Sequence, residues 1–209
     1  KDRPKLLFDK EKFLKVINNG KWITGAGIFS YAFQNIDNIV VGKFLGITSL
    51  GFYQQAYSIS TLPVSEVGQI FNKVTFPVFV KLSEERTRLR KAFFKTAAVI
   101  LLLVSFFILI ILLFSKPLIL IFLGSKWLTI EPVLKILAIF AVCKSLLNFS
   151  YSVFLALKMQ KTVMLSELFG IIGMGIAIYP MVMKYGIVGA GYSTIIAFIC
   201  SLPVVIYGL

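Results

Sequence analysis

The chain has 209 residues, of which 58% are hydrophobic, and its mean hydropathy of +0.89 is too high for an ordinary soluble domain. Its formal charge of +13 would suggest a nucleic-acid partner in a soluble protein, but the apolar residues gather in long runs. In residues 97–114, for example, Ser105 is the only polar side chain. The basic residues are therefore explained by loops that flank a membrane, and no nucleic acid is expected. The sequence has no histidine, and we expect neither a metal nor a cofactor.

The first 21 residues are basic and precede the apolar stretches. Seven of them are Lys or Arg, Asp9 can cap a helix, and Phe13 and Ile17 supply apolar positions. This pattern predicts a linker helix over residues 1–21 at the cytoplasmic face of the membrane, with a disordered basic tail as the alternative. Residues 22–209 are expected to form a membrane bundle. Because the sequence starts without Met and stops inside an apolar run, we expect a fragment of a longer chain.

Apolar stretches then follow in order, and each is long enough to cross a hydrocarbon layer of about 30 Å as a helix. Backbone groups at that depth must be paired within the segment, so helices are expected. The sequence thus predicts an all-α, polytopic membrane bundle with about six transmembrane helices, at residues 22–42, 50–80, 93–114, 132–157, 162–183 and from 187 to the end.

The basic residues of the loops predict the orientation. With residue 1 in the cytoplasm, the inside segments carry fifteen basic residues and the outside segments carry four. Because cytoplasmic loops are enriched in Lys and Arg, we expect the N-terminus of this chain to be cytoplasmic. The inside segments in this count are residues 1–21, 81–95 and 158–161, and the outside segments are 43–49, 115–127 and 184–187.

Polar side chains form a stripe along the first predicted span. Gln34 and Asn38 are four residues apart and share a helix face, and Asp37 lies at its edge. An acid within a span costs about 2.5–3.5 kcal/mol on insertion scales, so it should face a wet or polar interior. Asp37 is therefore a candidate for binding a proton or a cation. Hydrogen bonding between helices, or a place near the outer interface, is the alternative.

The second and fourth predicted spans also carry charged groups. Gln69 belongs to a polar stripe along the second span. Glu66 and Lys73 are seven residues apart, share a helix face and are expected to line a cavity, with a static charge pair as the alternative. Lys144 lies at the midpoint of the helix over residues 132–157, with Asn148 on the same face. An ammonium group at that depth needs a partner or water, and it would attract an anionic substrate. Pairing with a carboxylate is the alternative.

Four segments carry a resemblance to a known family. They resemble, in the same order and spacing, the second half of bacterial polysaccharide flippases of the O-antigen and colanic-acid type, often called Wzx, within the multidrug/oligosaccharidyl-lipid/polysaccharide exporter superfamily. The segments are "DNIVVGKFLGITSLGFYQQAYSISTLP" (residues 37–63), "VTFPVFVKLSEERTRLRKAFF" (74–94), "IFLGSKW" (121–127) and "YGIVGAGYS" (185–193).

The resemblance implies one lobe of a two-lobe transporter in the bacterial inner membrane. Such proteins move undecaprenyl-diphosphate-linked sugars between leaflets by alternating access, so the implied partners are a lipid-linked oligosaccharide, membrane lipid and a missing N-terminal lobe. Polymerase and glycosyltransferases are left open as further partners. The family's cationic cavity fits a pyrophosphate, and Lys144 and Lys73 are the candidates for that contact. Asp37, with Glu66, is a candidate for ion coupling or for a structural role.

Other functions are weighed against the flippase. A multidrug exporter of the same superfamily would favour an acidic or aromatic cavity, and the lysines argue mildly against it. A membrane enzyme would need clustered catalytic groups, usually in a large loop. No loop between the predicted spans exceeds about 15 residues, so an enzyme is not expected. The substrate-contact candidates are then Lys144, Lys73, Asn148, Gln69, Gln34 and Asn38.

Overall fold

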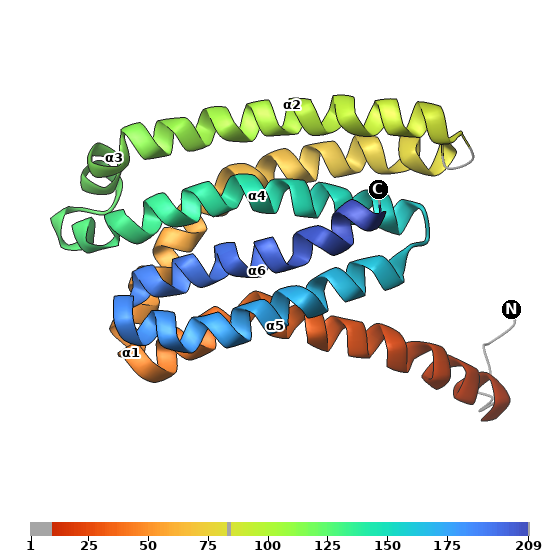
Figure 1. The fold of residues 1–209 in the computed structure, drawn as a ribbon, viewed down its shortest axis with the longest axis horizontal. Coiled ribbons are helices and arrows are strands. Elements are labelled where there is room, and N and C mark those ends of the chain that lie inside the picture. Colours follow the sequence, from red (N-terminus) through yellow and green to blue (C-terminus); the bar gives the residue numbers. More distant parts are fainter. Residues whose placement is uncertain (1–9, 83–84, 209) are drawn as a thin grey trace, which may run out of the picture.

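A computed structural model describes residues 10–82 and 85–208, and every regular element in these residues is helical (Figure 1). The predicted all-α membrane bundle is therefore confirmed. In chain order the elements are α1 (Lys10–Lys81), α2 (Arg86–Leu113), the short α3 (Ser115–Phe122), the 3-10 helix η1 (Ser125–Ile130), α4 (Glu131–Ala156), α5 (Gln160–Tyr185) and α6 (Ile187–Gly208).

Helix α1 consists of two helices that meet at Gly46. This glycine has φ 84° and ψ 171°, a conformation that is essentially reserved for glycine, and the backbone changes direction there. Asp37 precedes Gly46 by nine residues and Tyr53 follows it by seven, yet the two side chains are hydrogen-bonded. In a straight helix these positions would lie about 24 Å apart. The first half of α1 (residues 10–45) and the second half (47–81) therefore fold back on each other.

Among the residues that the structure describes, three helical segments are long and apolar enough to cross a membrane, judged by length and composition: Thr87–Leu113, Gln160–Tyr185 and Ile187–Gly208. The predicted count of six spans, and the division of the chain at residue 21, stay predictions. Of the predicted linker helix, residues 1–9 lie outside the described part of the chain, and residues 10–21 are the first turns of α1.

Helix α2 has one packed face and one exposed face, and both are apolar. Val104 and Ile108 are buried in the core that α2 forms with α1 and α4, whereas Leu102 and Phe106 on the other side are exposed. Phe93 at the start of α2 stacks on Phe149 of α4, with ring centroids 5.2 Å apart. An exposed apolar face suits contact with acyl chains.

Helices α5 and α6 form a hairpin that is held by small side chains. Ser201 Oγ donates a hydrogen bond to the carbonyl of Ser166, at 2.9 Å. A Cβ atom added at Gly173 would lie 2.5 Å from Sγ of Cys200. The two helices can approach this closely because Gly173 has no side chain. Small residues allow membrane helices to approach closely, and Gly173 does so here.

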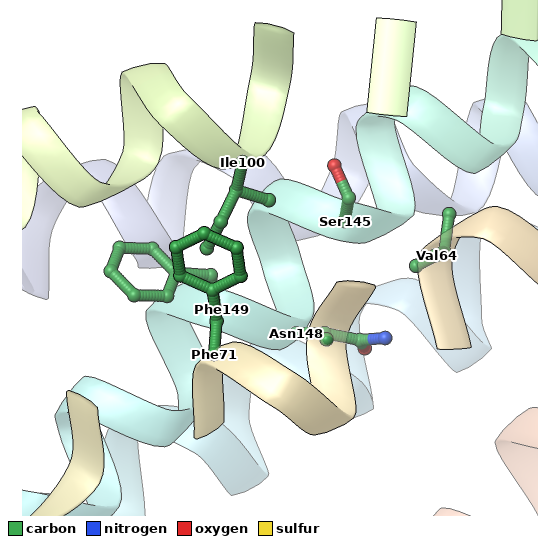
Figure 2. Close-up of a pocket in the computed structure, with 7 residues that line it drawn as sticks. Val64, Phe71, Ile100, Ser145, Asn148 and Phe149 are labelled. Carbon is green, nitrogen blue, oxygen red and sulfur yellow. The ribbon is translucent and has the colours of Figure 1, made fainter. Parts of the chain in front are cut away.

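A small cavity of about 20 Å³ lies where the second half of α1 meets α2 and α4 (Figure 2). Phe71, Ile100 and Phe149 gather on one side of it in this view, and Ser145 and Asn148 lie on the other. This volume holds about one water molecule. It is too small for a substrate, but Asn148 also borders the larger cavity described next.

Candidate functional site

A polar cavity of about 330 Å³ lies between the two halves of α1 and helices α4, α5 and α6. It takes charged or polar side chains from each of these helices, so it is assembled from segments far apart in the sequence. The lining residues are Gln34, Asp37, Tyr57, Phe140, Lys144, Leu147, Asn148, Tyr151, Glu167, Met174, Thr194, Ala197 and Phe198.

Asp37 brings a carboxylate into this cavity from the first half of α1. The residue is only 3% exposed, and a buried carboxylate is costly unless its oxygens are hydrogen-bonded. Oδ2 accepts a hydrogen bond from the Tyr53 hydroxyl at 2.7 Å, and Oδ1 accepts one from the backbone N–H of Asn38 at 2.8 Å. Each bond to a charged group contributes about 1.5–3 kcal/mol, so these two offset much of the burial cost.

Lys144 brings an ammonium group into the same cavity from the middle of α4. Its Nζ donates a hydrogen bond to the hydroxyl of Tyr57 at 2.5 Å and lies 4.8 Å from the centroid of that ring. The hydrogen bond favours a cation, because an oxygen lone pair of the phenol faces the ammonium. The phenol carries no negative charge, so Lys144 is held in place without being neutralised.

The α5–α6 side of the cavity is mostly neutral. The hydroxyl of Tyr151 on α4 lies 2.9 Å from Oγ of Ser166 on α5, which ties the two helices together at the cavity edge. Glu167 follows Ser166 and adds a second carboxylate to the lining, and Thr194 adds a hydroxyl from α6. The cavity therefore combines hydrogen-bonding groups, aromatic surface and charges of both signs.

Four of the predicted site residues meet in this cavity. Gln34 and Asp37 come from α1, and Lys144 and Asn148 come from α4. Asn38 is half-buried beside them and contributes its backbone N–H to Asp37. Their roles in binding or coupling stay predictions.

The other three predicted residues lie elsewhere on the molecule. Glu66, Gln69 and Lys73 are exposed on the second half of α1 and line neither of the two cavities described above. The spacing of Glu66 and Lys73 predicts a shared face, and both residues are exposed. The cavity formed by α1, α4, α5 and α6 does not include this face. Their assignment to substrate binding or ion coupling stays a prediction.

Two tyrosines of the site were missed by the sequence reasoning. Tyr53 and Tyr57 are four residues apart on α1 and so occupy one helix face; Tyr53 binds Asp37, and Tyr57 binds Lys144. The signal was the pair of phenols at this spacing within an apolar stretch. It is a weak signal, because tyrosine is also enriched at membrane interfaces.

Metal ligands do not cluster in the described residues. No group of three or more Cys, Asp or Glu side chains there comes close enough to hold a metal ion.

A separate charge pair lies at the N-terminal end of α4, where Glu131 precedes the predicted fourth span and Lys135 lies in its first turn. Nζ of Lys135 donates a hydrogen bond to Oε1 of Glu131 at 2.7 Å, and Oγ of Ser115 lies 3.3 Å from the same oxygen. The hydrogen bond from Lys135 lowers the pKa of Glu131 below its usual value of 4.5, and the charge of Lys116 acts in the same direction. The contact between Ser115 and Glu131 ties α3 to α4, and the pair of Glu131 with Lys135 does not line the cavity.

The fold and the cavity define a class first: a helical membrane protein with a transporter fold. Among solved structures, the lipid II flippase MurJ in its inward closed conformation matches with a TM-score of 0.83 at 18% identity, over 98% of this chain and 45% of MurJ. At that identity the likeness concerns the fold. The chain thus has the architecture of about half of that flippase.

The chain belongs to the polysaccharide biosynthesis protein family, which its residues 1–132 match. The teichuronic acid biosynthesis protein TuaB of Bacillus subtilis (strain 168) is 35% identical over 153 residues, 73% of this chain and 32% of TuaB. The lipopolysaccharide biosynthesis protein WzxC of Escherichia coli (strain K12) is 27% identical over 146 residues, 70% of this chain and 30% of WzxC. The resemblance to Wzx-type flippases is therefore confirmed. The chain spans about a third of the length of these curated relatives.

Proposed function

We propose that the intact protein is a flippase that moves a diphosphate-linked oligosaccharide lipid across the bacterial inner membrane for surface polysaccharide assembly. In this proposal it is a transporter and not an enzyme, and its N-terminal end in this chain is cytoplasmic. The relatives named for teichuronic acid and lipopolysaccharide biosynthesis support the substrate class, and the MurJ-like fold supports lipid flipping as the mechanism.

One observation carries the proposal at the level of chemistry: the ammonium of Lys144 lies in the polar cavity and is bound by a neutral phenol. A fixed positive charge attracts a diphosphate, and its N–H groups can donate to the diphosphate oxygens. Gln34 and Asn148 beside it offer amide groups that can bind sugar hydroxyls or phosphate oxygens.

The size of the cavity supports a head-group site rather than a site for the whole substrate. About 330 Å³ lies at the lower end of the range for small-molecule sites, enough for a diphosphate with an adjoining sugar. We infer that a second lobe of the intact protein completes the pathway for a longer glycan. The share of TuaB and of MurJ that this chain covers supports that inference.

The test uses a strain that lacks the gene and is complemented with variants of the intact protein. Lys144→Ala should lower surface polysaccharide at least about tenfold, because one charge-assisted contact to the substrate is lost, while the amount of protein in the membrane is unchanged. Lys144→Arg should keep most of the export, since the charge is retained. The matched control is Lys184→Ala, which removes an exposed lysine at the C-terminal end of α5. This variant should export normally.

Two results would count against the proposal. Normal export by Lys144→Ala would remove the cavity lysine from the mechanism. Resistance to cationic dyes that depends on the gene, with unchanged surface polysaccharide in its absence, would instead support a multidrug exporter, for which Asp37 would be the binding group.

A further inference from the structure

Two opposite charges share the cavity without forming an ion pair. Asp37 and Lys144 both line it. Within the described part of the chain, no ion pair within 4.0 Å joins these two side chains. Each of them is instead hydrogen-bonded to a tyrosine of the second half of α1.

Tyr53 holds the carboxylate. Its side chain is completely buried, and its hydroxyl donates to Oδ2 of Asp37 at 2.7 Å, while the N–H of Asn38 occupies Oδ1. Both carboxylate oxygens are thus bound by neutral donors. The bond also spans the fold at Gly46, so it fixes Asp37 relative to the second half of α1.

Tyr57 holds the ammonium. It lies one helical turn after Tyr53, the two rings have centroids 6.2 Å apart, and its hydroxyl accepts from Lys144. Ser60 and Thr61 both donate side-chain hydrogen bonds to the carbonyl of Tyr57, at 2.9 and 2.7 Å, which gives this turn additional local bonds. The phenol occupies one of the three N–H donors of the ammonium, so the others are available to a ligand.

We propose that Tyr53 and Tyr57 are positioning residues that hold Asp37 and Lys144 apart, so that the charge of Lys144 stays available to a diphosphate. This inference rests on the proposed function. Two neutral hydroxyls on successive turns of one helix satisfy the two charges separately. If either hydroxyl is lost, the released group pairs with its opposite across the cavity, and the paired lysine attracts an anion less strongly.

The experiment measures equilibrium binding of farnesyl diphosphate to the purified intact protein in detergent. Tyr57→Phe keeps the ring and removes the hydroxyl, and it should weaken binding about tenfold. Adding Asp37→Asn to that variant should restore the dissociation constant to within about twofold of the parent, because Asp37 can then no longer pair with Lys144. Tyr53→Phe, which releases Asp37, should weaken binding in the same direction and be restored in the same way.

The control is Tyr207→Phe, which removes the hydroxyl of an exposed tyrosine on α6 and should leave binding unchanged. Unaltered binding by Tyr57→Phe, or weakened binding that Asp37→Asn fails to restore, would overturn the inference, since a general packing defect is not repaired by a change at Asp37. If Tyr57→Phe does not fold, the Tyr53→Phe pair of variants decides by the same criterion.

Lys144→Ala distinguishes a failure of the positioning role from a failure of the proposed diphosphate site. Weakened binding by Lys144→Ala together with normal binding by Tyr57→Phe would refute the positioning role and leave the proposed function standing. Normal binding by Lys144→Ala would instead refute the diphosphate site itself.

Discussion

The contact between Gly173 of α5 and Cys200 of α6 allows a test of how tightly the hairpin is packed. A Cβ atom at Gly173 would lie 2.5 Å from Sγ and 2.8 Å from Cβ of Cys200. Favourable contacts between such atoms are at about 3.5–4.0 Å, so Gly173→Ala forces the helices apart by about 1 Å. Rotation of the cysteine side chain can move Sγ but not Cβ, so the strain cannot be relieved locally.

The expected cost of Gly173→Ala is about 1–3 kcal/mol, the range for overpacking a well-packed core. It is opposed by the gain of about 1 kcal/mol from replacing a helical glycine with alanine. Thermal unfolding of the purified protein in detergent, monitored by size-exclusion chromatography, should therefore show a Tm that is lowered by a few degrees. Gly173→Leu should lower it further, because the added side chain has no space on that face.

Two further variants make this test specific. Gly175→Ala lies two residues along the same helix, where an added Cβ meets nothing within 4 Å, and it should leave Tm unchanged or raise it. Gly173→Ala combined with Cys200→Gly moves the small residue to the other helix and should restore the free energy of unfolding to within about 1 kcal/mol of the parent's value. A Tm for Gly173→Ala equal to that of Gly175→Ala, or no restoration in the double variant, would refute the packing argument.

Two other predictions concern the loop ends. Lys158, between α4 and α5, has φ 60°, so Lys158→Gly should relieve strain and raise the free energy of unfolding by about 0.5–1 kcal/mol; a lower Tm would contradict this. The lowered pKa of Glu131 means that its pairing stabilises the fold above about pH 4.5 and is lost as the pH falls through that lowered value. Because Lys135 is half-exposed, the effect is below about 1 kcal/mol, and the Tm difference between the parent and Glu131→Gln should close as the pH falls below about 4.5 and through that lowered pKa, rather than stay constant.

The helical membrane fold could be predicted because the length of an apolar run is set by the thickness of the hydrocarbon layer. Lys144 could be predicted as a candidate site residue for a similar reason, since an ammonium at the midpoint of a span needs a partner wherever its helix packs. Both conclusions depend on one helix at a time, and this is the information that periodicity in a sequence contains.

The partners of these charges could not be predicted, because they depend on how helices are arranged around one another. The spacing of Glu66 and Lys73 places them on one face but does not say which neighbour that face meets, and the structure leaves it exposed. The contact of Asp37 with Tyr53 depends on the backbone at Gly46, where a single glycine in an apolar region gives little warning of a sharp change in direction.

The junction at Gly46 has a mechanical consequence for the cavity. The two halves of α1 share a single pivot, and Asp37 lies nine residues, or about 13 Å, from it along the helix. A rigid rotation of one arm by about 10° would displace its wall by only about 2 Å at Asp37, and by progressively more toward the far end. The displacement grows with distance from Gly46, so a small rotation there separates the two halves of α1 most at the ends that lie farthest from this glycine.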